Sequence, residues 1–258
     1  MRIVLALVAL TAALIGYEGD ASSLGPKPSL ERSHRPTATP RAGARWHGCV
    51  GSEGRHGFLR AGDGSRIAYA ATGRGRTAVV LAHQGNGDIC MWWPFAKRLA
   101  ASGFRAVAFD FRGFGLSPER PYPASLRKDL DLRAAIGQAR ALGSARVLLA
   151  GASLGGTIAL AEAARRDTPV KAVLSLSAPE SYVRFDGAAL ARRSKLPILF
   201  VAARDDSGGQ FATDARTLYR ASAATDKRLV ILAGVEHVAP LLERPSVRQL
   251  VLGWLRTH

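Results

Sequence analysis

A serine at the junction of an apolar run and an alanine-rich run is the residue best placed to do chemistry. Residues 146–164 read RVLLAGASLGGTIALAEAA, and Ser153 stands between Gly151 and Gly155 in the pattern G-x-S-x-G. The first run predicts a strand and the second predicts a helix. The turn that joins them must be tight, and it leaves no room for a Cβ atom two residues before or two residues after the serine. The sequence therefore predicts a strained Ser153 with a projecting hydroxyl, beside helix N–H groups able to bind an oxyanion.

A serine nucleophile needs a general base, and His237 is the candidate. It follows an apolar run at residues 229–232 and lies on the loop after the last predicted strand. From there an imidazole can take the hydroxyl proton and return it to the leaving group. We expect His83 to be structural, bonding its own loop from beneath. The other histidines precede the predicted sheet or end the chain: His34, His47, His56 and His258.

Apolar runs alternate with helical runs along most of the chain. Short, uniformly apolar strands between helices predict an α/β fold with a mostly parallel central sheet and helices on both faces. In such a sheet the reactive groups collect at the carboxyl ends of the strands. Strands are expected at 57–61, 66–71, 78–82, 106–110, 146–150, 172–177, 198–202 and 229–232, and helices at 91–102, 124–142, 211–223, 246–256 and directly after Ser153.

Five segments, in this order, resemble the α/β-hydrolase superfamily. They are HQGNGD from His83, DFRGFGLS from Asp110, GASLGG from Gly151, ARDD from Ala203 and GVEHVAPLL from Gly234. The resemblance covers roughly residues 58–258. It implies the α/β-hydrolase fold, with nucleophile, acid and base in that order along the chain. It also implies that the DFRGFGLS segment builds a turn beside the active-site entrance rather than taking part in the chemistry.

The resemblance places the acid after the penultimate predicted strand, where Asp205 and Asp206 are adjacent. The family pattern G-x-x-D aligns Ala203 with its glycine, which selects Asp206 and leaves Asp205 as a loop residue. Some relatives that the sequence resembles carry the acid after the preceding strand. Asp205, Glu180 and Asp186 therefore stay open as alternatives.

The oxyanion hole requires two backbone N–H donors. The residue after the nucleophile, Leu154, supplies the first. The second comes from the loop after an early strand, and the HG-x form of that loop maps it to Gly85. This chain has Gln84 where the family usually has glycine, so the second donor stays open between Gly85 and Gln84.

The beginning of the chain reads as an export signal followed by a linker. Arg2 precedes an apolar stretch at 3–16, which is too short to predict a membrane span, and small residues near Ala21 offer a cleavage site. The expected division is a signal peptide at 1–21, a disordered linker at 22–45 and an α/β-hydrolase domain at 46–258. An uncleaved membrane anchor is the alternative to a cleaved signal.

Cys49 and Cys90 are the two cysteines of the chain. In an exported chain a pair is more often bridged than free, so we expect a disulfide that ties the N-terminal segment down beside the active site. Two buried, unpaired thiols are the alternative.

The net charge of +16 arises from 36 Lys and Arg against 20 Asp and Glu, scattered along the chain. Scattered cations indicate a solvated surface with weak attraction to anionic cell-envelope surfaces, and no specific nucleic-acid site.

The histidines lack ligand spacing, and neither C-x-x-C nor a phosphate-binding loop is found, so no metal and no cofactor is expected. The oligomeric state is not indicated.

The interval at 178–196, before the acid-bearing strand, is too short for a cap domain and predicts at most one short helix at 186–193. The site should therefore be open. Trp92 and Trp93 either line an acyl pocket or pack in the core.

The leading hypothesis is an exported, carboxylesterase-like serine hydrolase that cleaves small esters or thioesters through an acyl-enzyme with a Ser–His–Asp triad. An acyltransferase or peptidase with the same triad is the runner-up, and a catalytically silent binding protein is the alternative outside the enzymes.

Overall fold

Residues 46–258 are described by the computed structural model of this chain. The expected signal peptide at 1–21 and linker at 22–45 lie outside the described residues. In the described part, no helix combines the length and apolar character needed to cross a membrane.

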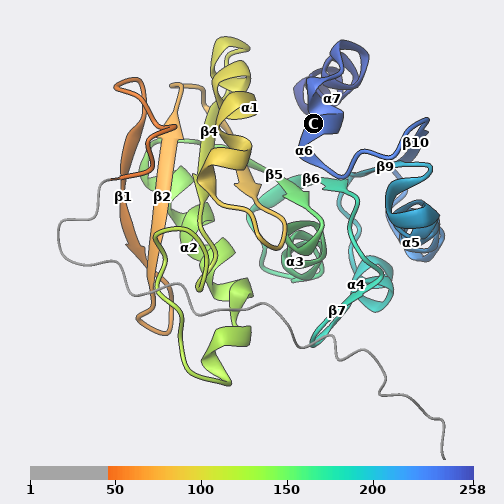
Figure 1. The fold of residues 1–258 in the computed structure, drawn as a ribbon, viewed down its shortest axis with the longest axis horizontal. Coiled ribbons are helices and arrows are strands. Elements are labelled where there is room, and N and C mark those ends of the chain that lie inside the picture. The colour runs from red at the N-terminus through yellow and green to blue at the C-terminus, as the bar shows by residue number, and fades with distance from the viewer. Residues whose placement is uncertain (1–45) are drawn as a thin grey trace, which may run out of the picture. The chain divides into compact units, whose positions relative to one another are not determined.

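The described residues form an eight-stranded sheet in the order β1-β2-β4-β3-β5-β6-β9-β10 (Figure 1). Strand β2 pairs antiparallel with β1 and with β4, and every other neighbouring pair is parallel. The expected mostly parallel sheet is confirmed. Its strands are β1 Arg55–Arg60, β2 Arg66–Thr72, β3 Thr77–Ala82, β4 Arg105–Phe109, β5 Arg146–Ala152, β6 Val170–Leu176, β9 Ile198–Ala203 and β10 Lys227–Leu232.

Helices cover both faces of this sheet. Helices α1, α6 and α7 pack into the core on one face, and α2, α3 and α5 pack into the core on the other. Successive side chains of a strand point to opposite faces, so a strand between two helical layers is apolar throughout. The helices are α1 Ile89–Ala101, α2 Lys128–Ala141, α3 Leu154–Ala163, α4 Gly187–Arg193, α5 Gln210–Ala221, α6 Ala239–Glu243 and α7 Pro245–Thr257.

The single helix expected at 124–142 is wrong at its start. A 3-10 turn, η1 (Ala124–Leu126), precedes α2, and the two are separated at Arg127. Nη1 of Arg112 donates a hydrogen bond to the carbonyl oxygen of Ala124 at 2.7 Å, so this carbonyl is bonded to a side chain. A long-range contact thus overrides the local helical pattern.

The segment between β6 and β9 contains no cap domain, as expected. It forms a two-stranded hairpin, β7 (Ser181–Tyr182) with β8 (Phe185–Asp186), followed by α4. Helix α4 packs against α3 and α5. The hairpin was not predicted, because strands of two residues carry no periodic signal.

The two tryptophans of α1 belong to the core. Trp92 is 0% exposed and Trp93 is 1% exposed, and both lie in the cluster between the sheet and helices α1 and α7. The indole of Trp93 donates to Glu53 Oε1 at 3.2 Å. The core interpretation is confirmed, and the acyl-pocket interpretation is wrong.

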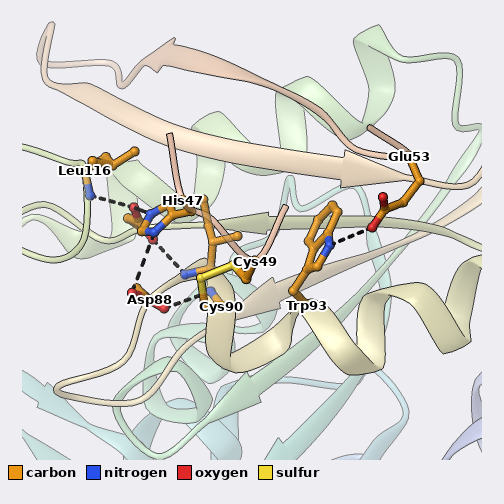
Figure 2. The surroundings of a disulfide bond; sticks show 9 residues. His47, Cys49, Glu53, Asp88, Cys90, Trp93 and Leu116 are labelled. Atoms are coloured by element: carbon orange, nitrogen blue, oxygen red, sulfur yellow. Dashed lines mark hydrogen bonds and ion pairs between the residues drawn. A yellow bond between two sulfur atoms is a disulfide. The ribbon is translucent and has the colours of Figure 1, made fainter. Parts of the chain in front are cut away.

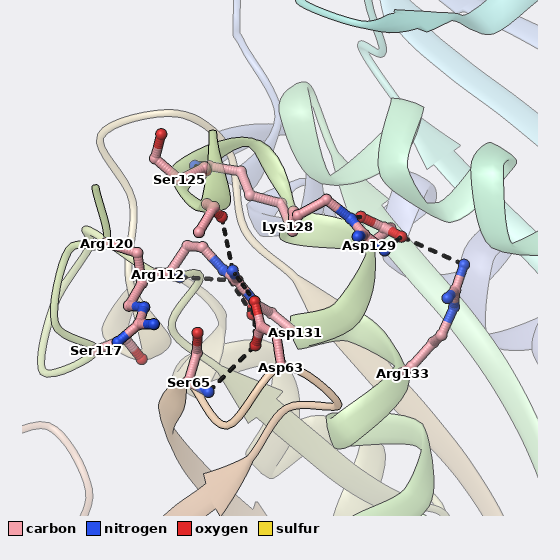
Figure 3. A network of polar contacts seen from close by, with 12 residues as sticks. Asp63, Ser65, Arg112, Ser117, Arg120, Ser125, Lys128, Asp129, Asp131 and Arg133 are labelled. Carbon is pink, nitrogen blue, oxygen red and sulfur yellow. Dashed lines mark hydrogen bonds and ion pairs between the residues drawn. The ribbon is translucent and has the colours of Figure 1, made fainter. Parts of the chain in front are cut away.

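A buried ion pair holds the turn after β4 against α2 (Figure 3). Arg112 and Asp131 are both fully buried, and Arg112 donates to Asp131 from its backbone N–H at 3.0 Å and from Nε at 2.9 Å. Asp63 accepts a further hydrogen bond from Arg112 Nη1 at 2.7 Å. Removing one partner of such a pair leaves an uncompensated charge in the interior.

We expect Asp131→Ala to lower the free energy of unfolding by about 3–5 kcal/mol, because Arg112 then stays buried without its main counter-charge. Asp129→Ala is the matched control. Asp129 also lies in the first turn of α2, but its partners Arg127 and Arg133 are 39% and 34% exposed, so its loss should cost about 1 kcal/mol or less. Urea denaturation measures both, and equal losses would contradict the expectation.

Candidate active site

Ser153 lies on a strained turn between β5 and α3. Its backbone has φ 48° and ψ −116°, in the left-handed half of conformational space that a side chain disfavours. A Cβ on Gly151 would approach the Gly155 carbonyl oxygen to 2.3 Å, and a Cβ on Gly155 would approach the Ala82 oxygen to 2.2 Å. The glycines at both positions are therefore required, as the sequence pattern predicts.

The candidate residues share the carboxyl edge of the sheet. In the strand register Ala82 at the end of β3 is opposite Gly151 of β5, and Ala203 at the end of β9 is opposite Leu232 of β10. The loops that follow β3, β5, β9 and β10 therefore begin at the same edge. These loops carry His83, Ser153, Asp206 and His237.

A buried carboxylate orients the candidate base. His237 Nδ1 lies 2.7 Å from Asp206 Oδ2, and Asp206 is 1% exposed whereas the His237 side chain is 30% exposed. A carboxylate only accepts hydrogen bonds, so Nδ1 carries the proton and Nε2 is left as the free base. The ring of Phe211 packs against the imidazole with centroids 4.4 Å apart. Within the described residues, Ser153 and His237 are not joined by a hydrogen bond.

The loop after β3 is held by its first residue. His83 is fully buried, and its Nδ1 donates to the Gln84 carbonyl oxygen at 2.6 Å while its Nε2 accepts from the Phe111 N–H at 2.9 Å. Burial lowers the pKa of His83, which keeps the ring neutral in this single tautomer. The expected structural role of His83 is confirmed.

The same contacts fix the peptide that follows. The Gln84 carbonyl oxygen also accepts from the Gly87 N–H at 3.1 Å. The C=O of Gln84 and the N–H of Gly85 belong to one planar trans peptide and point in opposite directions. The Gly85 N–H is therefore turned away from these donors. Leu154, the first residue of α3, presents an N–H for which the helix itself has no acceptor.

Comparison with known proteins identifies the family. A model of the α/β-hydrolase fold family matches residues 77–205. The chain belongs to the α/β-hydrolase family. The resemblance to the α/β-hydrolase superfamily is thereby confirmed.

The relatives of this chain carry names that describe different activities. The chain is 30% identical over 180 residues to epoxide hydrolase 3 of Xenopus tropicalis, covering 68% of this chain but only 47% of that protein. An uncharacterised protein of Mycobacterium tuberculosis is 31% identical over 216 residues, covering 73% of this chain and 74% of that one.

Several solved structures share the fold of this chain. An esterase of Pyrococcus furiosus superposes with a TM-score of 0.68 at 15% identity, covering 79% of this chain and 91% of the esterase. An enol-lactonase of Burkholderia xenovorans superposes with a TM-score of 0.66 at 18% identity, covering 78% of this chain and 100% of the lactonase.

Of the four carboxylates considered for the acid, Asp206 is the one that the structure places against His237. Asp205 is exposed, and its backbone N–H donates to the Gly234 carbonyl oxygen at 3.0 Å. Asp186 caps α4 by accepting from the Ala189 N–H at 2.8 Å. The fourth, Glu180, is exposed.

Sequence reasoning missed the backbone conformation of Val238 and the hydrogen bond of His47. Val238, directly after His237, has φ 57° and is fully buried. A β-branched residue at positive φ is a strong outlier, and no local pattern signals it. The hydrogen bond of His47 to Asp110 at 2.7 Å was missed because it joins segments 63 residues apart.

His47, Asp88 and Cys90 are the described residues grouped closely enough to consider a metal, with possible ligand atoms within 4.8 Å of one another. The sulfur of Cys90 is bonded to Cys49 and His47 Nε2 is bonded to Asp110. We therefore assign no metal to this group.

Asp206→Asn should lower kcat on an activated ester about a hundredfold or more, because an amide no longer stabilises the imidazolium and permits the wrong tautomer. Asp205→Asn is the matched control on the adjacent, exposed residue and should leave kcat nearly unchanged. Steady-state kinetics of the two variants decides the matter. If Asp205→Asn or Glu180→Gln is the more damaging, the assignment of the acid fails.

Proposed function

We propose that this hydrolase cleaves carboxylic esters or thioesters through an acyl-enzyme, with Ser153 as nucleophile, His237 as general base and Asp206 as the orienting acid. The observation that carries the proposal is the buried 2.7 Å contact between Asp206 and His237 at the sheet edge that also bears the strained serine. It occupies Nδ1 and leaves Nε2 of a partly exposed side chain available to accept a proton, as a general base requires.

The reaction follows from this arrangement. As the Ser153 oxygen attacks the substrate carbonyl, its proton passes to His237 Nε2, and Asp206 stabilises the imidazolium that forms. His237 then protonates the departing alcohol or thiol, and water attacks the acyl-enzyme by the same route. In free enzymes the serine–histidine contact is often long and tightens when substrate binds.

We assign the oxyanion hole to the N–H groups of Leu154 and Gly85. Leu154 begins α3, so its N–H is free and lies at the positive end of the helix dipole. Gly85 is chosen over Gln84 because the Gln84 carbonyl is held by His83 and Gly87, which fixes the orientation of the Gly85 N–H in the same peptide. A Cβ at Gly85 would meet nothing within 4 Å, so the space beside the Gly85 Cα is open.

Chemistry favours an ester over an epoxide as substrate, although one relative is named an epoxide hydrolase. Attack of a serine hydroxyl on an epoxide would give an ether. An ether has no carbonyl for water to attack, so the enzyme would not be released. An acyl-serine does have that carbonyl, and the absence of a cap domain between β6 and β9 leaves water access to it.

We also propose that the hydrolase works in an oxidising compartment outside the cytoplasm. The bond between Cys49 and Cys90 supports this location, because disulfides persist in oxidising surroundings. The apolar stretch at 3–16 is the expected export signal.

A fluorophosphonate probe should label the wild-type chain, and Ser153→Ala should abolish both labelling and ester hydrolysis. Removal of the nucleophile costs about 10⁶-fold in rate when the triad acts as a unit. Ser181→Ala, which changes an exposed serine of the β7 hairpin, should retain both. Hydrolysis by Ser153→Ala at more than about a tenth of the wild-type rate is incompatible with this mechanism.

Short acyl esters should be hydrolysed at least as well as long ones. No cap domain lies between β6 and β9, and Trp92 and Trp93 are buried in the core, so neither can cover a long acyl chain. Each uncovered methylene forgoes about 0.8 kcal/mol of binding. The measurement is kcat/KM across p-nitrophenyl esters from acetate to decanoate. A steep rise with chain length, or activation on emulsified substrate, would instead indicate a lipase-like enzyme.

A further inference from the structure

Residues 46–54, which we term the strap, precede β1 and are bound to the start of α1 and to the turn after β4 (Figure 2). Cys49 is joined to Cys90 by a disulfide with the Cα atoms 5.6 Å apart, which confirms the predicted pairing. His47 Nε2 lies 2.7 Å from Asp110 Oδ2. The family's sequence segments do not predict either contact. His47 and Cys49 both lie before residues 58–258, the region that resembles the family.

Asp110 links the strap to α1, the helix that follows the loop after β3. Its carboxylate is fully buried; Oδ1 accepts from the Ile89 N–H at 2.8 Å, and Oδ2 accepts from the Leu116 N–H at 2.8 Å. Because a carboxylate only accepts, His47 Nε2 is a donor in this cluster. Ile89 and Cys90 are the first residues of α1, so the strap holds the beginning of this helix through both Asp110 and the disulfide.

Charge strengthens the contact of His47. Burial by itself lowers the pKa of His47, but the hydrogen bond to Asp110 and the charges of Asp110 and Asp88 outweigh burial and raise that pKa above its usual value. The Asp88 carboxylate is 3.8 Å from His47 Nδ1 and also caps α1 by accepting from the Cys90 N–H at 2.8 Å.

The oxyanion loop, residues 83–88, is therefore held at both ends. At its first residue His83 is bonded to the Phe111 N–H. At its last residue Asp88 begins α1, which the strap fixes. Only residues 84–87 lie between these anchors, and they include Gly85. A displacement of the start of α1 is thus transmitted to the Gly85 N–H, and donors of an oxyanion hole act only within a few tenths of an ångström of their proper place.

We propose that the strap is a positioning element of the active site, in which the Cys49–Cys90 disulfide and the His47–Asp110 hydrogen bond hold the oxyanion loop in its working geometry. Reduction of the disulfide then lowers kcat without unfolding the hydrolase. This inference rests on the proposed function, because it concerns the same oxyanion hole. Both sulfur-bearing residues are only partly buried, so a reductant can reach them.

The redox step is a thiol–disulfide exchange. A dithiol reductant supplies two electrons and two protons to the sulfur–sulfur bond, which gives the thiols of Cys49 and Cys90 and the disulfide of the reductant. Removal of the reductant and air oxidation should restore the bond and the activity.

The test compares reduced wild type with four variants at a temperature where circular dichroism shows all of them folded. Cys49→Ser with Cys90→Ser, and separately His47→Leu, should lower kcat on a short ester about tenfold or more with KM little changed, as expected when only transition-state stabilisation is lost. His47→Gln should retain most of the activity, because its amide can still donate to Asp110. Glu53→Gln, which alters the strap at its Trp93 contact, should behave as wild type.

Reductant should lower kcat of the wild type to that of the double cysteine variant and leave that variant unchanged. Hydrogen exchange supplies a readout independent of activity. Reduction should speed amide exchange in residues 83–91 and leave α5 unaffected. Unchanged kcat and unchanged exchange in folded, reduced protein would overturn the inference. If wild type hydrolyses no ester, the proposed function fails, and the exchange measurement alone decides whether the strap holds the loop.

Discussion

The buried contact between Asp206 and His237 determines which nitrogen of the imidazole is free, and the proposed chemistry depends on that choice. The contact exists because β9 and β10 are adjacent parallel strands whose carboxyl ends meet, with Ala203 opposite Leu232. Asp206 is 1% exposed and His237 is 30% exposed. The proton on Nδ1 is therefore directed at a buried carboxylate, which leaves Nε2 as the nitrogen available to act as the proposed base.

The opposite side of the site is held by a different kind of contact. There the backbone of the loop after β3 is fixed by side chains from elsewhere in the chain: His83 bonds Phe111, and Asp110 bonds Ile89. The Cys49–Cys90 disulfide and His47 add a covalent bond and a hydrogen bond from residues before the sheet. His237 is thus positioned by Asp206 and the ring of Phe211, whereas the loop proposed to carry an oxyanion donor is held by a connected set of contacts.

The sequence predicted those structural features that depend on residues close together in the chain. The strands could be read from uniform apolar runs because both faces of the sheet are covered, and the strained serine could be read from two glycines whose Cβ atoms would collide with backbone. The choice of Asp206 over its neighbour required the family pattern, because nothing in the adjacent pair itself separates them. The rest depends on contacts between distant residues. Arg112 binds the Ala124 carbonyl and interrupts an expected helix, and His47 reaches Asp110 across 63 positions.

The proposed mechanism requires a covalent acyl group on Ser153, and mass spectrometry of the whole chain and of its peptides tests this most directly. The chain is mixed with excess p-nitrophenyl acetate, quenched in acid during the first turnover and digested. We expect one acetyl group per chain, located on the peptide that contains Ser153 and absent from Ser153→Ala. Turnover of the ester with no acyl group on any peptide, or with the acyl group on another residue, would contradict this account.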